Sequence, residues 1–112
     1  MFEYNAHVTS VYDADTITVN IDLGFKSGLR DVKLRLYGIN APEVRGAEKE
    51  KGRKSRDWLR DRILDKDVII KTYRDKTGKY GRWLANVYPV DDQSKSFNQM
   101  LVEEGLAKEA AY

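Results

Sequence analysis

Apolar and polar residues alternate along three early stretches of the chain, a pattern typical of half-buried β-strands. In the second stretch Ile17, Val19 and Ile21 alternate with polar residues, and the third alternates valine and leucine with charged residues. The expected strands cover residues 6–12, 16–23 and 32–37. A tight acidic turn at residues 13–15 and a polar loop framed by Gly24 and Gly28 join them, so we predict a three-stranded antiparallel meander.

A polar, basic stretch follows the third strand. Residues 44–56 are almost wholly polar, and we interpret them as a mobile basic loop. The loop is expected to pass into a helix that ends near Leu64. The apolar face of this helix is narrow, formed by Trp58, Leu59 and Ile63, and would cover one end of a barrel.

The last third of the chain predicts two more strands and a helix. The strands are expected over residues 68–73 and 82–88, with a hairpin loop between them at residues 75–80. Alternation in the second of these strands puts Trp83 on the side of Ala85 and Val87, as part of the core or a lid on the barrel. Ser96 and Gln99 fit a capping box, and Gly105 is the expected stop of the helix that follows.

The order of these elements predicts the fold. Three strands, a helix, two strands and a helix is the order of the five-stranded OB barrel, which commonly binds oligonucleotides. We therefore predict an α+β, predominantly β fold, a five-stranded OB-fold barrel with two to three helices. Residues 1–112 are expected to form a single domain, because the chain contains no internal repeat and no linker.

Composition limits the chemistry available to the chain. It has no cysteine and a single histidine, which excludes disulfides, thiolate sites and histidine-rich metal sites and leaves oxygen ligands for a metal. There is no apolar run of membrane-spanning length and no secretory signal, so we expect a cytoplasmic protein without a membrane partner, with secretion of a longer precursor left open. The net charge of +2 neither requires nor excludes nucleic acid.

The stretch from Val32 to Glu43 carries the clearest chemical signal. The alternation puts Arg35 on the face away from the apolar residues, and Pro42 helps to end the strand so that Glu43 enters a loop at its exit. A carboxylate near a strand-anchored guanidinium suits phosphodiester hydrolysis. Asp15 and Asn40 lie beside turns and carry oxygens suited to a hard cation such as calcium. Taken singly, each of these residues is also a common turn or surface residue.

Three separated motifs together resemble the thermonuclease family, also called staphylococcal-nuclease-like. They are Asp-Ala-Asp-Thr at residues 13–16, Arg-Leu-Tyr-Gly-Ile-Asn-Ala-Pro-Glu at 35–43 and Lys-Tyr-Gly-Arg at 79–82. The resemblance covers almost the whole chain. It implies a calcium-dependent endonuclease on an OB barrel that cuts DNA and RNA and leaves 3′-phosphate and 5′-hydroxyl ends.

The resemblance also implies roles for individual residues. Calcium ligands would be the side chains of Asp15 and Asn40 and the backbone carbonyl of Ala41; Glu43 would be the general base, Arg35 and Arg82 the phosphate ligands, and Lys79 and Tyr80 the contacts to a terminal phosphate. We expect a monomer that acts on single-stranded or frayed DNA and RNA with little sequence preference.

The chain departs from the family pattern in three places. Family members typically carry an acidic residue where Asn40 stands, so we expect weaker calcium binding here. Ala41 lacks a hydroxyl often found at its position, and Tyr112 is offset from the family's base-stacking aromatic. One alternative is therefore a non-catalytic OB module that binds single strands through Lys79, Tyr80 and the basic loop.

The three residues expected to carry the chemistry favour an enzyme over that alternative. A pure binding module has no need of a base at Glu43 between two arginines, Arg35 and Arg82. A structural subunit that merely inherits the barrel is a third, remote alternative.

Overall fold

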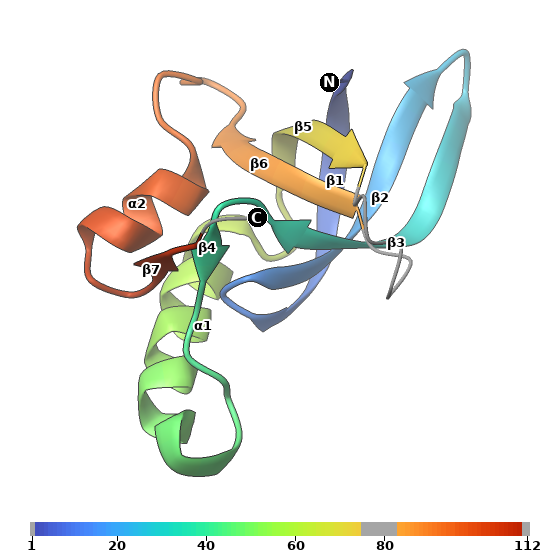
Figure 1. Cartoon of the computed structure of the whole chain (residues 1–112). Coiled ribbons are helices and arrows are strands. Elements are labelled where there is room, and N and C mark those ends of the chain that lie inside the picture. Colours follow the sequence, from blue (N-terminus) through green and yellow to red (C-terminus); the bar gives the residue numbers. More distant parts are fainter. Residues whose placement is uncertain (1, 75–82, 111–112) are drawn as a thin grey trace.

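Five strands close into a barrel, and two helices lie outside it (Figure 1). The computed structural model describes residues 2–74 and 83–110. The barrel strands are β1 (Phe2–Asp13), β2 (Thr16–Gly24), β3 (Ser27–Leu36), β5 (Asp67–Arg74) and β6 (Trp83–Pro89). Around the barrel the order is β1-β2-β3-β6-β5, with β3 and β6 parallel and the other pairs antiparallel. The predicted α+β fold with a five-stranded OB-like barrel is confirmed.

The barrel interior is built from β-branched and leucine side chains that the alternation placed on one face of each strand. Val8, Val19, Leu34, Ile70 and Val87 are fully buried. The strand β1 shifts register twice against β2, and the second shift lies between Val11 and Asp13. Such irregularities bend a strand and change the direction of the side chains after them, so the second shift affects how Asp13 enters the acidic turn.

The hairpin between β2 and β3 differs from the predicted polar loop. The turn consists of Phe25 and Lys26, both with positive φ, and β3 begins at Ser27, five residues before the expected start. Residues 27–31 are exposed, because the hairpin projects beyond the barrel body (Figure 1). A strand exposed on both faces has no apolar alternation, which is why the sequence pattern did not reveal it.

The predicted mobile basic loop at residues 44–56 is wrong over most of its length. A short 3-10 helix, η1 (Gly46–Glu48), leads into α1 (Lys49–Ile63). The buried face of α1 is formed by Gly52, Ser55, Leu59 and Ile63. Two of these four are small and not apolar, so a search for apolar periodicity finds only the second half of the helix. Lysine, arginine and glutamate are good helix formers, which explains how so charged a segment is helical.

The last helix, α2 (Phe97–Glu103), begins and ends as the sequence predicted. Ser96 Oγ accepts a hydrogen bond from the Gln99 backbone N–H at 3.1 Å, whereas the Gln99 side chain donates to Glu103 instead of completing the box. Gly105 has a φ of +71°, in the left-handed region that favours glycine. Within residues 2–74 and 83–110, neither helix is long and apolar enough to cross a bilayer.

The buried side chain of Asn98 fastens α2 to the barrel. Its amide nitrogen donates to the backbone oxygens of Tyr37 at 2.9 Å and Ala85 at 3.0 Å, and its oxygen accepts from the Val87 N–H at 3.0 Å. One side chain therefore joins α2, β6 and the turn after β3. The sequence analysis had no signal for it, because a single asparagine on a short helix looks like a surface residue.

Trp83 does not lie in the core as predicted. Its side chain is 42% exposed, while Leu84, Ala85 and Val87 are buried. Two consecutive buried residues interrupt the alternation at the start of β6, so the pattern of Ala85 and Val87 does not extend back to Trp83.

Candidate functional site

The turn between β1 and β2 meets the end of β3 and the segment after it at one end of the barrel. Thr16 stands opposite Arg35 in the β2–β3 register, and the Leu36 N–H donates to the Asp15 carbonyl at 2.8 Å. Asn40 belongs to β4 (Ile39–Asn40), which pairs with β7 (Lys108–Glu109). These pairings bring two separate motifs to the same place, the first with Asp15 and the second with Arg35 and Asn40.

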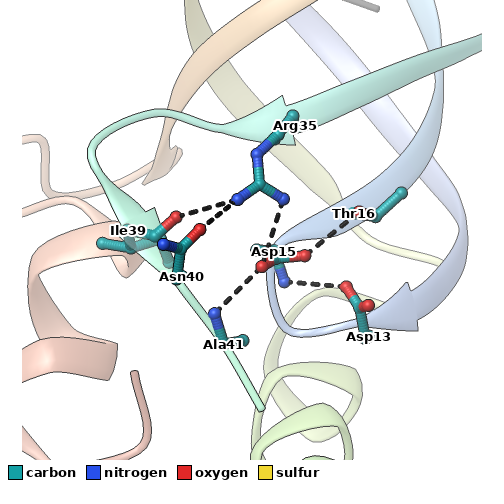
Figure 2. A network of polar contacts seen from close by, with 7 residues as sticks. All are labelled: Asp13, Asp15, Thr16, Arg35, Ile39, Asn40 and Ala41. Atoms are coloured by element: carbon teal, nitrogen blue, oxygen red, sulfur yellow. Dashed lines mark hydrogen bonds and ion pairs between the residues drawn. The ribbon is translucent and has the colours of Figure 1, made fainter. Parts of the chain in front are cut away.

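Arg35 forms the centre of the polar network in Figure 2. Its Nη1 lies 3.2 Å from Asp15 Oδ2, and its Nη2 donates to Asn40 Oδ1 and, at 3.4 Å, to the Ile39 carbonyl. The side chain is only 19% exposed, so solvent screens these contacts weakly. One guanidinium thus lies between the two side chains predicted to be metal ligands.

Asp15 is held by donors on several sides. Its Oδ2 accepts from the Ala41 N–H at 2.9 Å and its Oδ1 from Thr16 Oγ1 at 3.1 Å. Burial alone would raise its pKa, but hydrogen bonds from Asp13 and Ala41 and the charge of Arg35 lower the pKa below its ordinary value. Asp15 is therefore a carboxylate at neutral pH.

Asp13 has the opposite electrostatic character. Burial, together with hydrogen bonding to and repulsion from the neighbouring Asp15 carboxylate, raises the pKa of Asp13 to about 7. Asp13 Oδ1 accepts from the Asp15 N–H at 3.1 Å, which fixes the shape of the turn. In this pair Asp15 is therefore the ionised carboxylate. Ionisation of Asp13 as well is disfavoured unless a bound cation compensates the second negative charge.

A pocket of about 490 Å³ opens over this network. Five of the predicted site residues line it: Asp15, Arg35, Asn40, Ala41 and Glu43. Glu43 is exposed in the segment between β4 and η1. The other three, Lys79, Tyr80 and Arg82, lie outside the described residues, as does Tyr112.

Two acidic residues that the sequence analysis did not select also line the pocket. Glu48 ends η1, and its sequence neighbourhood of alternating lysine and glutamate gives no sign of a site. Asp13 belongs to the acidic turn at residues 13–15, and its spacing of two from Asp15 is a signal for an interacting carboxylate pair.

The residues present fit a hard dication. Asp15 Oδ2 and Asn40 Oδ1 already face a common positive group, the Arg35 guanidinium, and the Ala41 carbonyl belongs to the same segment. Calcium prefers such oxygen ligands and accepts water for the rest. In the described parts of the chain no three acidic or histidine side chains gather closely enough to hold a metal between them.

Comparison with known proteins identifies the family. Residues 33–112 match the model of the staphylococcal nuclease homologue family, well over half of the chain. The chain belongs to this family. The match includes Arg35, Asn40 and Glu43 and the segment 79–82, while the turn that carries Asp15 precedes it.

Three similar proteins align with most of the chain. A thermonuclease from Staphylococcus intermedius is 31% identical over 108 residues, which are 94% of this chain and 59% of the relative. An uncharacterized endonuclease from Haemophilus influenzae is 33% identical over 100 residues, 89% of this chain and 49% of the relative. The protein ParB of Escherichia coli is 29% identical over 111 residues, which are 94% of this chain and 56% of the relative. The chain thus spans about half the length of these relatives, or slightly more.

Proposed function

We propose that this chain is a calcium-dependent phosphodiesterase, an endonuclease that hydrolyses DNA and RNA with little sequence preference and leaves 3′-phosphate ends. The observation that carries the proposal is the pocket in which Arg35 lies between Asp15 and Asn40 while Glu43 lines the same wall. The names of two relatives, a thermonuclease and an endonuclease, support the same reaction class.

Arg35 is suited to bind the scissile phosphate. A phosphodiester repels nucleophiles, and its transition state gathers negative charge on the phosphoryl oxygens. A planar guanidinium can donate two parallel hydrogen bonds to those oxygens, and Arg35 is held on β3 by oxygens of Asp15, Ile39 and Asn40. The protein therefore fixes the direction of this cation before substrate arrives. Arg82, on the sequence motif at residues 79–82, would supply a second one.

Glu43 is suited to act as the general base. It is exposed at the pocket, where it can accept a proton from a water that attacks phosphorus. Among the described residues no lysine, arginine or histidine lies within ion-pair distance of the exposed Glu43 side chain. The nearby guanidinium would hold the phosphate while Glu43 orients the nucleophile.

The calcium ion would be held by Asp15, Asn40 and the Ala41 carbonyl. When bound it supplies positive charge that offsets the charge developing on the phosphate. Asp15, whose pKa is lowered, is ionised and ready to bind at neutral pH. Asn40 contributes an oxygen without a charge, so the protein provides less negative charge than an acidic residue would at this position.

A Glu43→Gln variant tests this assignment. The amide keeps the size of the side chain but cannot accept the proton, so turnover of denatured DNA should fall by roughly a hundredfold or more. Binding of an uncleaved oligonucleotide, followed by fluorescence anisotropy, should stay the same or tighten slightly.

A calcium titration of the same variant separates the three roles that Glu43 can have. A general base predicts low turnover at every calcium concentration. A metal ligand predicts recovery at high calcium, and an uninvolved loop residue predicts wild-type turnover throughout; either result would remove Glu43 from the role of base.

The second candidate function is single-strand binding without cleavage. The observation that favours it is the amide of Asn40, which removes one charge from the predicted metal site. It predicts oligonucleotide binding that needs no calcium and an absence of cleavage products even at millimolar calcium. The same anisotropy and cleavage measurements therefore distinguish the two functions.

A further inference from the structure

A glycine on α1 lies directly against the backbone of Glu43. A Cβ atom built on Gly52 would lie 2.0 Å from the Glu43 carbonyl oxygen, 2.3 Å from its carbonyl carbon and 2.8 Å from the Val44 nitrogen. These are backbone atoms, which cannot turn aside as the end of a flexible side chain can. Gly52 is buried, and it lies in the fourth position of α1.

Backbone conformation does not explain a glycine at this position. Gly52 is absent from the residues with positive φ, and a glycine inside a helix costs stability relative to alanine. Alanine at position 52 would therefore make the helix more stable if nothing lay against it. The close approach of the Glu43 and Val44 backbone is the feature that the missing side chain permits.

We propose that Gly52 is a positioning residue for Glu43, an inference that rests on the proposed function of Glu43 as the base. Gly52 lets the segment between β4 and η1 pack directly on α1. This packing fixes the backbone of Glu43 and therefore the position from which its side chain reaches the pocket. A side chain at position 52 displaces that segment outward and moves the carboxylate away from the phosphate and its attacking water.

A neighbouring contact explains why the effect should be local. One turn further along α1, Ser55 Oγ donates to the Leu106 carbonyl at 2.7 Å and so anchors the chain before β7, which pairs with β4 at Asn40. Asn40 and its side of the pocket are thus held on α1 by a separate contact. Displacing the Glu43 segment at Gly52 leaves that contact in place.

The test is a double-mutant cycle of Gly52→Ala and Glu43→Gln, measured on denatured DNA at saturating calcium. Gly52→Ala should lower kcat by roughly tenfold to a hundredfold with little change in KM, because a misplaced base loses rate and not binding. In the Glu43→Gln background the same substitution should have almost no further effect. Asp57→Ala, an exposed position of α1, is the control for adding alanine to the helix and should turn over normally.

The outcomes separate this proposal from the proposed function. If Glu43→Gln itself leaves turnover unchanged, the base assignment fails and Gly52 has nothing to position. If Glu43→Gln is slow but Gly52→Ala is not, or if the two losses multiply in full, the positioning role of Gly52 is wrong. A circular-dichroism melt establishes whether Gly52→Ala is folded.

A measurement on the unmodified protein covers the case in which Gly52→Ala does not fold. A nuclear Overhauser effect between a Gly52 α-proton and the Val44 amide proton is expected, because the position of the missing Cβ is 2.8 Å from the Val44 nitrogen. A protein that binds oligonucleotide normally and lacks this signal would overturn the proposal.

Discussion

The two side-chain oxygens that Arg35 contacts in this pocket are the ones proposed to bind calcium. In the structure its guanidinium contacts Asp15 and Asn40, and in the proposed reaction it binds phosphate while these two oxygens bind calcium. The two arrangements are compatible, because a dication between the oxygens would replace the positive charge that Arg35 now supplies. The residue-scale hypothesis is therefore that calcium and phosphate enter the pocket together and that each favours binding of the other.

Asn40 is the uncharged side chain among the proposed calcium ligands. Asn40→Asp adds one negative charge to the predicted ligand set, so calcium binding should tighten by on the order of tenfold or more, as measured by calorimetry. Asn5→Asp, the same change toward the start of β1, is the matched control and should leave the affinity unchanged. An affinity that stays the same or weakens in Asn40→Asp would show that Asn40 is not a ligand.

Asp13 should make stability depend on pH in metal-free protein. Its folded-state pKa of about 7 lies above the ordinary value of 3.8, so between these values the native state binds a proton that the unfolded state has lost. This contribution is complete below pH 3.8 and is lost as the pH rises through 7. Asp15 has a lowered pKa, so its contribution to stability has the opposite pH dependence. That contribution is present at pH values above 3.8 and is lost only in acid.

Asp13→Asn isolates the contribution of Asp13, because the amide imitates the protonated acid. Relative to this variant, the wild type should lose about 1 kcal/mol or more of unfolding free energy between pH 4.5 and pH 7.5, since one pKa unit corresponds to about 1.4 kcal/mol. Urea unfolding of both proteins with chelator present measures the difference. Parallel pH curves for the two proteins would contradict the raised pKa.

The sequence predicted which residues gather at the site better than it predicted their contacts. Asp15, Arg35, Asn40, Ala41 and Glu43 line one pocket, since turn residues at strand ends meet where strands pair, and the roles assigned to them stay predictions. The ion pair of Arg35 with Asp15 and the raised pKa of Asp13 depend on register and burial. Neither property is visible in the spacing of residues along one strand.

At the scale of elements, α1 shows what hydrophobic patterning cannot detect. The sequence predicted its second half from Leu59 and Ile63, which lie under the barrel, and missed its first half. There the buried positions are Gly52 and Ser55, which are chosen for close approach and for a hydrogen bond instead of apolar area. Backbone that packs against a helix leaves no apolar signal in the sequence. In this fold the backbone that packs on α1 is that of Glu43, the proposed base.

Asn98 adds buried hydrogen bonds between α2 and the barrel to the apolar packing of Phe97 and Leu101. Asn98→Ala removes three hydrogen bonds and leaves buried backbone groups of β6 without partners, so the free energy of unfolding should fall by about 2 to 4 kcal/mol. Chemical denaturation measures this loss. Asn86→Ala, a half-buried asparagine of β6, is the control and should cost much less. Equal losses in the two variants would mean that the Asn98 network contributes little.

At the scale of the whole molecule, the order of elements was enough to predict an OB-like barrel. It was not enough to predict which strands pair to close that barrel. Closure requires the parallel pairing of β3 with β6, in which Leu34, Arg35 and Leu36 stand opposite Trp83, Leu84 and Ala85. Partners that far apart in the chain leave no trace in local alternation. This pairing places the start of β6 beside Arg35, and therefore brings the chain that follows the 79–82 motif to the site.

We have proposed that this barrel carries a pocket for calcium-supported cleavage of nucleic acid. The most direct test is to incubate the purified chain with denatured DNA in calcium or in excess chelator, and to label the new ends with a polynucleotide kinase without prior phosphatase treatment. We expect cleavage in calcium, none in chelator, recovery when calcium is restored in excess, and 5′-hydroxyl ends that accept label directly. Cleavage that persists in chelator, or an absence of cleavage at millimolar calcium while the DNA still binds, would contradict it.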